Sequence, residues 1–267
     1  MTDAALKITT WNVNSLTARL ARAEAWLRAN QSDVLCLQEL KLESHKFPHE
    51  IFEALGYRAA VYGQKTYNGV AILAKNGLPE FTDVVMGVPG FADEQCRAIA
   101  VTMGDTRLID LYVVNGQSVD SDKYQYKLRW LDGVSAWLGA ERAKYEKLVV
   151  VGDFNIAPTD ADVHDPALWA GQVLCTDKER AAYEHWVSLG MVDCFRKFDH
   201  PPKTFTWWDY RMLGFPKNLG MRIDHILASP AVADTCTACV IDRNERKGEK
   251  PSDHAPVTAT FAATFDV

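Results

Sequence analysis

The sequence predicts an α/β protein in which short buried strands alternate with amphipathic helices. Residues 148–151, Leu-Val-Val-Val, form an unbroken apolar run followed by Gly152, which is typical of a strand covered on both faces. Residues 6–37 follow the order strand, helix, strand. With 267 residues, of which 48% are hydrophobic, the chain can bury a sizeable core, and we expect one domain over residues 1–267.

The N-terminal unit is predicted from three consecutive patterns. Residues 6–11 alternate as a strand does, and Ser15 or Thr17 can then cap a helix whose apolar residues recur at helical spacing as far as Asn30. Residues 34–37 form a second short apolar run. We therefore expect two strands joined by a helix.

The middle of the chain predicts two hairpins and a long helix. A short helix over residues 47–55 ends at Gly56. Turn signals at Asn68-Gly69 and Gly104-Asp105 separate strand-like segments. The expected strands are residues 57–62, 70–74, 97–102 and 107–114. Helical periodicity follows over residues 122–143.

The second half of the chain is less regular. Residues 158–175 are rich in turn formers and predict a surface loop of a length that is usually functional or mobile. A helix is expected over residues 177–189. Residues 204–211 combine aromatic and basic side chains, which fits equally a strand carrying core aromatics or a surface that stacks bases and pairs phosphates. Strands are expected over residues 221–229 and 235–241.

Polar side chains follow several of these predicted strands. Asn12 and Glu39 end the first two strands, and Asp153 and Asn155 follow the run at residues 148–151. Tyr112 lies near the end of another strand, with Asn115 just beyond it. Ligands of open α/β sheets bind at such strand ends. Each motif alone is more typical of a solvated strand end or an Asx turn, so only their number favours a site.

An acidic residue inside an apolar strand gives a further indication of a site. Asp224 interrupts residues 221–229, and a buried carboxylate requires a partner. His254 can supply that partner, while the neighbouring Asp253 can face a cation. An isolated Asp-His in a turn flanked by prolines is usually structural, so this pair depends on the other motifs.

Composition limits the class of protein. No apolar run approaches the roughly 18 residues that span a bilayer, and residues 1–5 lack the basic start of a signal peptide, so we expect a cytoplasmic protein. The net charge of −6 argues against a sequence-independent polyanion binder. Basic residues nevertheless gather in the second half, at Arg196, Lys197, Lys203, Arg211, Lys217, Arg222, Arg243, Arg246, Lys247 and Lys250. The six scattered cysteines favour reduced, buried thiols over a disulfide framework.

The ordered motifs resemble the signature blocks of the exonuclease III and abasic-site endonuclease family, within the wider superfamily of DNase I-like phosphohydrolases. The blocks are Thr-Trp-Asn-Val-Asn-Ser-Leu at residues 10–16, Leu-Gln-Glu-Leu-Lys at 37–41, Gly-Val-Ala-Ile at 69–72, Gly-Asp-Phe-Asn-Ile at 152–156, Arg-Ile-Asp at 222–224 and Ser-Asp-His-Ala-Pro at 252–256. The resemblance covers residues 8–261. It implies a four-layer α/β/β/α sandwich in which two packed mixed sheets are flanked by helices.

The resemblance also implies roles for individual residues. Glu39, Asn12 and Asp253 match positions beside a Mg²⁺ ion, with Mn²⁺ as an alternative, and hard oxygen ligands suit either ion. Asp153 and Asn155 match the residues that position the attacking water, and Asp224 and His254 match an Asp-His pair. The remaining matches contact substrate: Tyr112 and Asn115 the phosphate, Trp207, Met221 and Ile223 an apolar deoxyribose pocket, and Arg211 the DNA.

The function implied is a Mg²⁺-dependent DNA repair nuclease that leaves 3′-hydroxyl ends. Its expected partner is double-stranded DNA, including abasic or 3′-blocked DNA, and we expect a monomer that does not bind membranes. Abasic-site incision and 3′ to 5′ exonuclease activity are both implied. Residues 158–175 are expected near the rim of the deoxyribose pocket, where they would influence the balance between these two activities. Two alternatives remain: a superfamily phosphohydrolase acting on a lipid or inositol phosphate, and a non-catalytic DNA-binding module.

Overall fold

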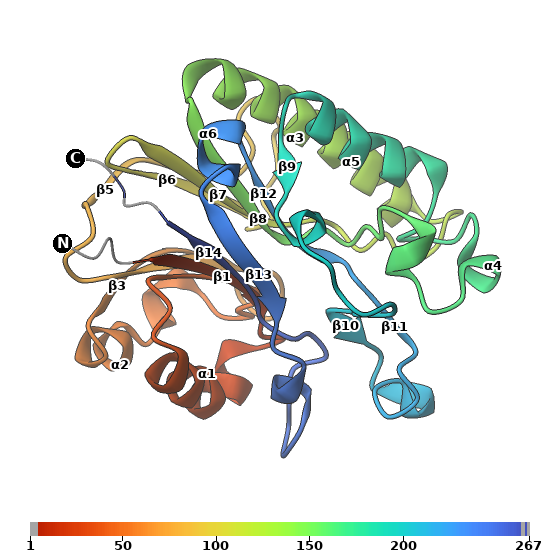
Figure 1. Cartoon of the computed structure of the whole chain (residues 1–267), viewed down its shortest axis with the longest axis horizontal. Helices are drawn as coiled ribbons and strands as arrows, with labels where there is room; N and C mark the ends of the chain where they lie inside the picture. The colour runs from red at the N-terminus through yellow and green to blue at the C-terminus, as the bar shows by residue number, and fades with distance from the viewer. Residues whose placement is uncertain (1–4, 263–264, 266–267) are drawn as a thin grey trace.

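The computed structural model describes residues 5–262 and 265. Two six-stranded mixed sheets pack face to face and helices cover their outer faces, which confirms the predicted four-layer sandwich (Figure 1). The sheet nearer the N-terminus has the order β13-β14-β1-β2-β4-β3. Its strands are β1 (Leu6–Asn12), β2 (Val34–Gln38), β3 (Tyr57–Tyr62), β4 (Val70–Lys75), β13 (Cys236–Ile241) and β14 (Val257–Phe261).

The second sheet has the order β5-β6-β7-β8-β12-β9. Its strands are β5 (Phe81–Met86), β6 (Ala98–Met103), β7 (Thr106–Tyr112), β8 (Lys147–Asp153), β9 (Val192–Asp193) and β12 (Asp224–Ala228). In each sheet one central pair is parallel, β1 with β2 and β7 with β8, and the other pairs are antiparallel. This parallel pairing brings the carboxyl ends of those strands to the same edge of the sandwich.

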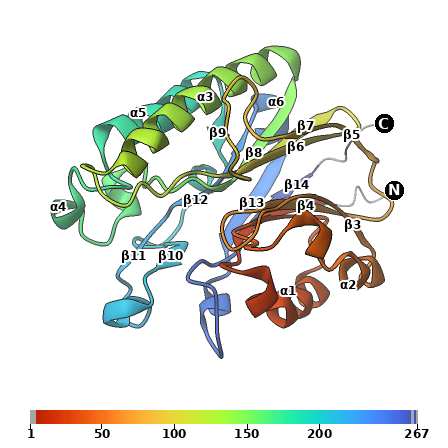
Figure 2. The same cartoon turned by 180° about the vertical axis from the view of Figure 1, so that it is seen from behind.

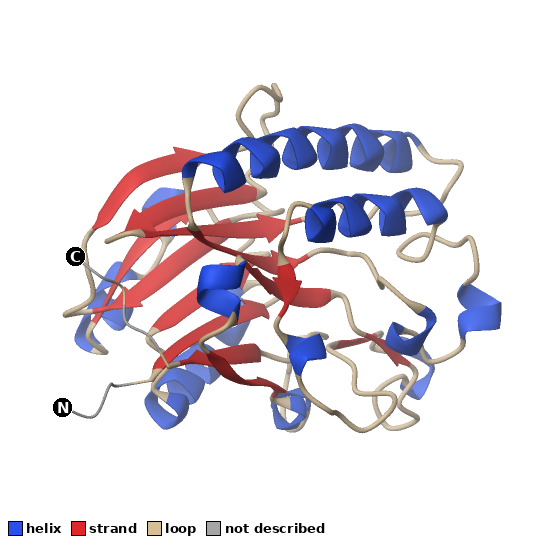
Figure 3. Cartoon of the chain, turned by 45° about the horizontal axis from the view of Figure 1, so that its top comes forward, coloured by secondary structure: helices blue, strands red, loops and turns tan. Residues whose placement is uncertain are grey.

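The helices pack on the outer faces of the two sheets. Helices α1 (Leu16–Asn30) and α2 (His49–Ala54) cover the first sheet, and the long helices α3 (Asp122–Lys144) and α5 (Asp177–Ser188) lie side by side over the second (Figure 3). As predicted, the side chain of Ser15 caps α1. Two short helices, α4 (Pro166–Trp169) and α6 (Pro230–Ala233), complete the α-helical structure of the described residues.

Strand β8 is apolar on both faces because it lies between two apolar layers. Val149 and Val151 point into the core between the two sheets. Leu148 and Val150 point outward, against the layer that α3 and α5 cover. Successive side chains of a strand alternate between its faces, so a strand covered on both sides needs a continuous apolar run.

The structure departs from the expected elements in several places, and β9, β14 and α6 are elements that the sequence analysis did not predict. Strand β5 was not predicted, because its exposed side chains give no apolar alternation at this sheet edge. Residues 204–211 contain only a two-residue strand, β10 (Trp207–Trp208), paired with β11 (Gly220–Met221). The strand expected over residues 221–229 is broken between β11 and β12. Residues 158–175 contain α4 and a 3₁₀ turn, so they are not a bare loop.

The short ribbon of β10 and β11, together with α4, lies at the end of the sandwich opposite to β5, and the view from behind agrees (Figure 2). All six cysteines are buried free thiols. Across residues 5–262 no helix is both long and apolar enough to cross a bilayer.

Candidate active site

Asp153 is the last residue of β8, and its placement depends on the glycine before it. Gly152 has a φ of +141°, and a Cβ there would lie 1.9 Å from the carbonyl oxygen of Leu111 on the parallel strand β7. Only glycine permits this approach. The chain then turns, because Asn155 adopts a left-handed φ of 46° and donates its backbone N–H to Asp153 Oδ1 at 2.9 Å. The two side chains therefore meet through an Asx turn rather than through a continued strand.

A single amide joins the carboxylates that come from the two sheets. The side chain of Asn12, at the end of β1, donates to Glu39 Oε1 and to Asp153 Oδ2, both at 2.9 Å. Glu39 follows β2 with a left-handed φ of 53°. Such strained backbone angles are often found at functional sites. Asn12 thus holds Glu39 and Asp153 side by side, as the sequence analysis expected.

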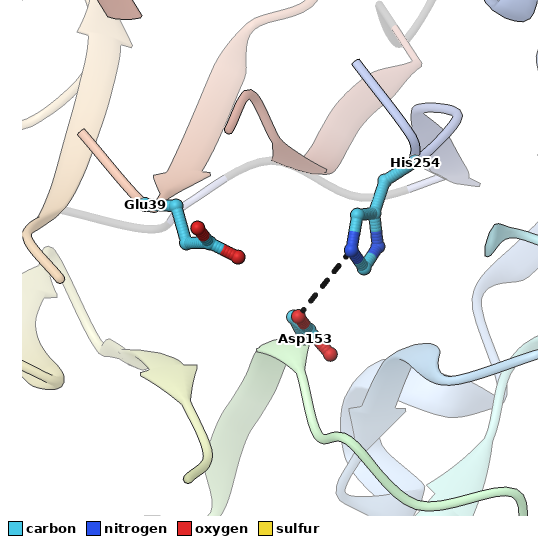
Figure 4. A group of neighbouring side chains, drawn as sticks. All are labelled: Glu39, Asp153 and His254. Atoms are coloured by element: carbon cyan, nitrogen blue, oxygen red, sulfur yellow. Dashed lines mark ion pairs between the residues drawn. The ribbon is translucent and has the colours of Figure 1, made fainter. Parts of the chain in front are cut away.

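The Asp-His pair is also brought together. Asp224 lies directly opposite Asp153 in the antiparallel pairing of β12 with β8. His254 Nδ1 lies 2.9 Å from Asp224 Oδ2, and Nε2 lies 3.6 Å from Asp153 Oδ2. Figure 4 shows Glu39, Asp153 and His254 pointing toward one another from three separate segments. The pair predicted from the sequence is therefore formed.

Burial and charge determine the protonation of these groups. Burial disfavours a charged imidazole, but the carboxylates of Asp224 and Asp153 outweigh it and raise the pKa of His254 to about 10. Burial raises the pKa of Asp153 to about 7, an effect that His254 opposes. The two neighbouring carboxylates thus favour the protonated imidazole of His254, and burial raises the pKa of the Asp153 carboxyl beside it.

The donor set fits a divalent metal ion. Glu39, Asp153 and His254 each place a ligand atom within 4.8 Å of the others. Nδ1 of His254 is engaged by Asp224, and the carboxylate oxygens of Glu39 and Asp153 are the hard donors of the group. Hard oxygen donors favour ions of the Mg²⁺ and Mn²⁺ type. Lys41 Nζ, 3.1 Å from Glu39 Oε2, partly neutralises this cluster.

Asp253 lies beside the cluster without belonging to that group. Its Oδ1 accepts from Asn14 and its Oδ2 from Trp207 Nε1, at 2.9 and 3.0 Å. Metal ligation by Asp253 would use the lone pairs that these bonds leave free, and it remains a prediction. The contact with Trp207 connects the acidic cluster with the apolar side of the site.

A cleft of about 460 Å³ opens beside the carboxylates. Glu39, Tyr112 and Asn115 line it together with the cations Lys41, Arg97 and Lys123, and the tyrosines Tyr67 and Tyr126. Burial and the Glu39 carboxylate raise the pKa of Tyr112 well above its ordinary value, so its hydroxyl keeps its proton. A larger hollow of about 580 Å³ lies between α3 and α5 and contains none of these groups. Chemistry therefore identifies the smaller cleft as the site.

The three expected pocket residues lie together, but they differ in exposure. Met221 and Ile223 are fully buried in a cluster with Val163, Val173 and Leu174 from the 158–175 segment, and Trp207 packs on it from a partly exposed position. The 158–175 segment thus borders the cluster, as expected. Arg211 lies apart on an exposed turn, where it pairs with Asp209 at 2.7 Å.

Sequence reasoning missed several residues that build the site. Asn14 donates to Asp253 and accepts from Lys41. The hydroxyl of Thr206 accepts from the backbone N–H groups of Ile223 and Asp224, which fixes the backbone of the acid in the Asp-His pair. Asn14 and Lys41 lie within the resembling blocks, so their polarity could have identified them. A threonine in a distant segment gives no such signal.

Comparisons with known proteins agree with this geometry. The profile of the Endonuclease/Exonuclease/phosphatase family matches residues 9–254. Exodeoxyribonuclease III of Haemophilus influenzae is 35% identical over 96% of this chain and 100% of its own length. Among solved structures, the 3′ phosphatase NExo from Neisseria bound to a product DNA hairpin superposes with a TM-score of 0.92 at 44% identity, covering 96% of this chain and 99% of that one. An AP endonuclease from Archaeoglobus fulgidus has a TM-score of 0.91 at 39% identity, with coverage of 97% and 100%.

The chain therefore belongs to the Endonuclease/Exonuclease/phosphatase family. It is a nuclease of the branch that contains exodeoxyribonuclease III and the AP endonucleases. The predicted family and fold are confirmed.

Proposed function

We propose that the chain is a Mg²⁺-dependent DNA repair nuclease, able to use Mn²⁺, that hydrolyses phosphodiesters of double-stranded DNA and leaves 3′-hydroxyl ends. The activities are 3′ to 5′ exonuclease, removal of 3′-blocking groups and incision 5′ to abasic sites. The observation that carries the proposal is the convergence of Glu39, Asp153 and His254, of which Glu39 also lines the cleft.

The contacts support the proposed residue roles. Asp153 and Asn155 orient the attacking water, and a base whose pKa lies near neutral pH is suited to accept its proton. Asp224 holds His254 so that the imidazolium meets a phosphoryl oxygen as negative charge develops. Tyr112 and Asn115 face the phosphate from the cleft.

Glu39, with Asn12 and Asp253 nearby, would hold the metal ion. When bound, the ion neutralises phosphate charge and polarises the phosphorus–oxygen bond. The two carboxylates are held in place without the ion, because Asn12 donates hydrogen bonds to both Glu39 and Asp153.

The apolar cluster supports the abasic part of the proposal. Trp207 offers a partly exposed ring in front of the buried Met221 and Ile223. An apolar wall of this kind accepts a deoxyribose that lacks its base more readily than an intact, stacked nucleotide. Arg211 and the cations of the cleft would pair with backbone phosphates. The enzyme would act as a monomer in the cytoplasm, without binding membranes.

The test is a labelled duplex that carries one internal abasic-site analogue, incubated with Mg²⁺ or EDTA and resolved on a sequencing gel. A metal-dependent cut 5′ to the analogue is expected, together with shortening from the 3′ end. Asp153→Asn should bind the same duplex and hardly cleave it. Shortening alone, with the analogue uncut, would remove abasic incision from the proposal, and no metal-dependent cleavage at all would overturn it.

The alternatives of the sequence analysis are not favoured. Activity on a lipid or inositol phosphate has no support in the compared relatives and structures, which are nucleases or a 3′ phosphatase bound to DNA. A non-catalytic module would not need buried carboxylates whose ionisation is costly.

A further inference from the structure

Lys127 of α3 and Glu179 of α5 form an ion pair with no exposure to solvent. Burial lowers the pKa of Lys127, and the Glu179 carboxylate opposes that effect. A buried pair of this kind adds little net stability compared with apolar side chains of similar size, because both charges lose their hydration. Its position directly beneath Asn155 points to a role in fixing geometry.

The ammonium group of Lys127 also binds the backbone of both active-site amides. Its Nζ donates to the carbonyl oxygen of Asn155 at 2.6 Å and to that of Asn115 at 3.1 Å. The two side chains are joined in turn, since Asn115 Nδ2 donates to Asn155 Oδ1 at 3.1 Å. One buried cation thus fixes Asn155, two residues after Asp153, together with Asn115, which lines the cleft.

The carboxylate of Glu179 holds the wall of the apolar cluster. It accepts from the backbone N–H groups of Leu174 and Thr176, both at 3.0 Å, and from the Thr176 hydroxyl at 2.7 Å. Leu174 has a left-handed φ of 78°, which a leucine adopts only when its surroundings impose it. Leu174 packs in the same cluster as Met221 and Ile223.

We propose that the Lys127–Glu179 pair is a positioning device that sets the catalytic amide Asn155 and the apolar sugar-side wall at Leu174 in one fixed arrangement. Neither residue reaches the cleft, so each acts through the backbone groups that it binds. The inference rests on the proposed function, because it assumes that Asn155 orients the water and that the cluster faces the sugar.

The chain offers a matched control at the other end of α3. Arg107 of β7 pairs with Glu141 of α3 at 2.6 Å, with side chains only 2% and 13% exposed. Arg107 also donates to the backbone carbonyl of Asp83, just as Lys127 donates to backbone carbonyls. Losing Arg107 therefore removes a comparable buried pair without touching the active site.

The experiment compares Lys127→Met with Arg107→Met in steady-state kinetics on duplex DNA with Mg²⁺, well below both melting temperatures. We expect Lys127→Met to lower kcat by about 10- to 100-fold, since a displacement of 1 Å can cost about 100-fold. KM should stay within about threefold of wild type. Arg107→Met should lose similar thermal stability and keep kcat within about threefold of wild type.

Lys127→Arg is the rescue variant and also the fallback if Lys127→Met does not fold. It keeps the positive charge and N–H donors that can reach the same carbonyl groups, although from a planar fork, so it should restore part of kcat. A kcat for Lys127→Met equal to that of Arg107→Met would overturn the positioning role, and so would a Lys127→Arg variant that folds normally and stays as slow as Lys127→Met. Absence of metal-dependent cleavage by the wild type would instead overturn the proposed function.

A second readout tests the link to the sugar-side wall. The ratio of abasic-analogue incision to 3′-phosphate removal is measured for wild type, Lys127→Met and Arg107→Met. We expect the ratio to fall only in Lys127→Met, because its unpaired Glu179 shifts the segment at Leu174. An unchanged ratio would show that the Lys127–Glu179 pair positions only Asn155 and Asn115. It would refute the proposed link between this pair and the apolar wall at Leu174.

Discussion

Both carboxylate oxygens of Asp224 contact the imidazole of His254: Oδ1 and Oδ2 lie 3.1 and 2.9 Å from His254 Nδ1. Asp224 stands opposite Asp153 in the paired strands β12 and β8. The strand pairing therefore places Asp224, which contacts the imidazole, and Asp153, which we propose to orient the attacking water, at the same end of the sheet.

Asp224→Asn should lower the rate of DNA cleavage by about 100- to 10,000-fold, the usual contribution of a positioned acid or base. The amide removes the negative charge that raises the pKa of His254, so less imidazolium is present. Single-turnover cleavage with saturating enzyme measures the chemical step. Asp199→Asn, at an exposed position, is the control, and equal rates for the two variants would remove the pair from the mechanism.

Glu39→Gln should weaken binding of Mn²⁺ by at least about 10-fold, a loss typical even of an outer-shell partner of a metal ligand. The substitution keeps the shape of the side chain and removes the charge beside Asn12. Calorimetric titration of the protein with Mn²⁺ in the absence of DNA gives the affinity directly. Glu43→Gln, nearby and paired with Lys46, should titrate like wild type; unchanged affinity in Glu39→Gln would refute the ligand assignment.

Asp110→Asn should become more stable, relative to wild type, as the pH rises. Asp110 is buried, accepts from Gln38 at 2.7 Å, and its second oxygen has no partner among the described residues. Burial raises its pKa well above the ordinary value. A raised native pKa means that stability is full below the unfolded pKa of about 3.9 and is lost as the pH climbs through the native pKa.

Asparagine at position 110 carries no such titration. Melting temperatures of both proteins between about pH 4 and pH 8 test the prediction, since the unfolded carboxyl titrates at the lower end of that range. The difference should move steadily in favour of Asp110→Asn. A difference that does not change with pH would show that Asp110 is not held neutral in the native state.

Arg222→Met should destabilise the fold by about 3–5 kcal/mol, the cost of leaving buried charges without their partner. Arg222 pairs with Asp162 at 2.6 Å and with Asp193 at 2.8 Å, and all three are largely buried. Urea unfolding gives the free energy. Arg211→Met, which breaks an exposed pair, should change stability little; a similar small effect for Arg222→Met would contradict the buried network.

The sequence by itself identified the candidate residues of the site. Glu39 after β2 and Asp153 at the end of β8 follow apolar runs typical of buried strands, Asp224 interrupts such a run, and the ordered blocks identify the family. The four-layer arrangement follows from the same resemblance. The apolar pattern of the sequence does not determine strand register. The register of β12 with β8 places Asp224 opposite Asp153, 71 positions earlier in the chain.

Only the tertiary structure decided the contacts that depend on segments far apart in the chain. Lys127 looks like any helix residue in the sequence, yet packing of α3 on α5 buries it under Asn155. The edge strand β5 gave no signal, because an exposed edge needs no apolar alternation. Local apolar patterns specify strands and helices, whereas pairing and packing over long separations decide which polar groups meet.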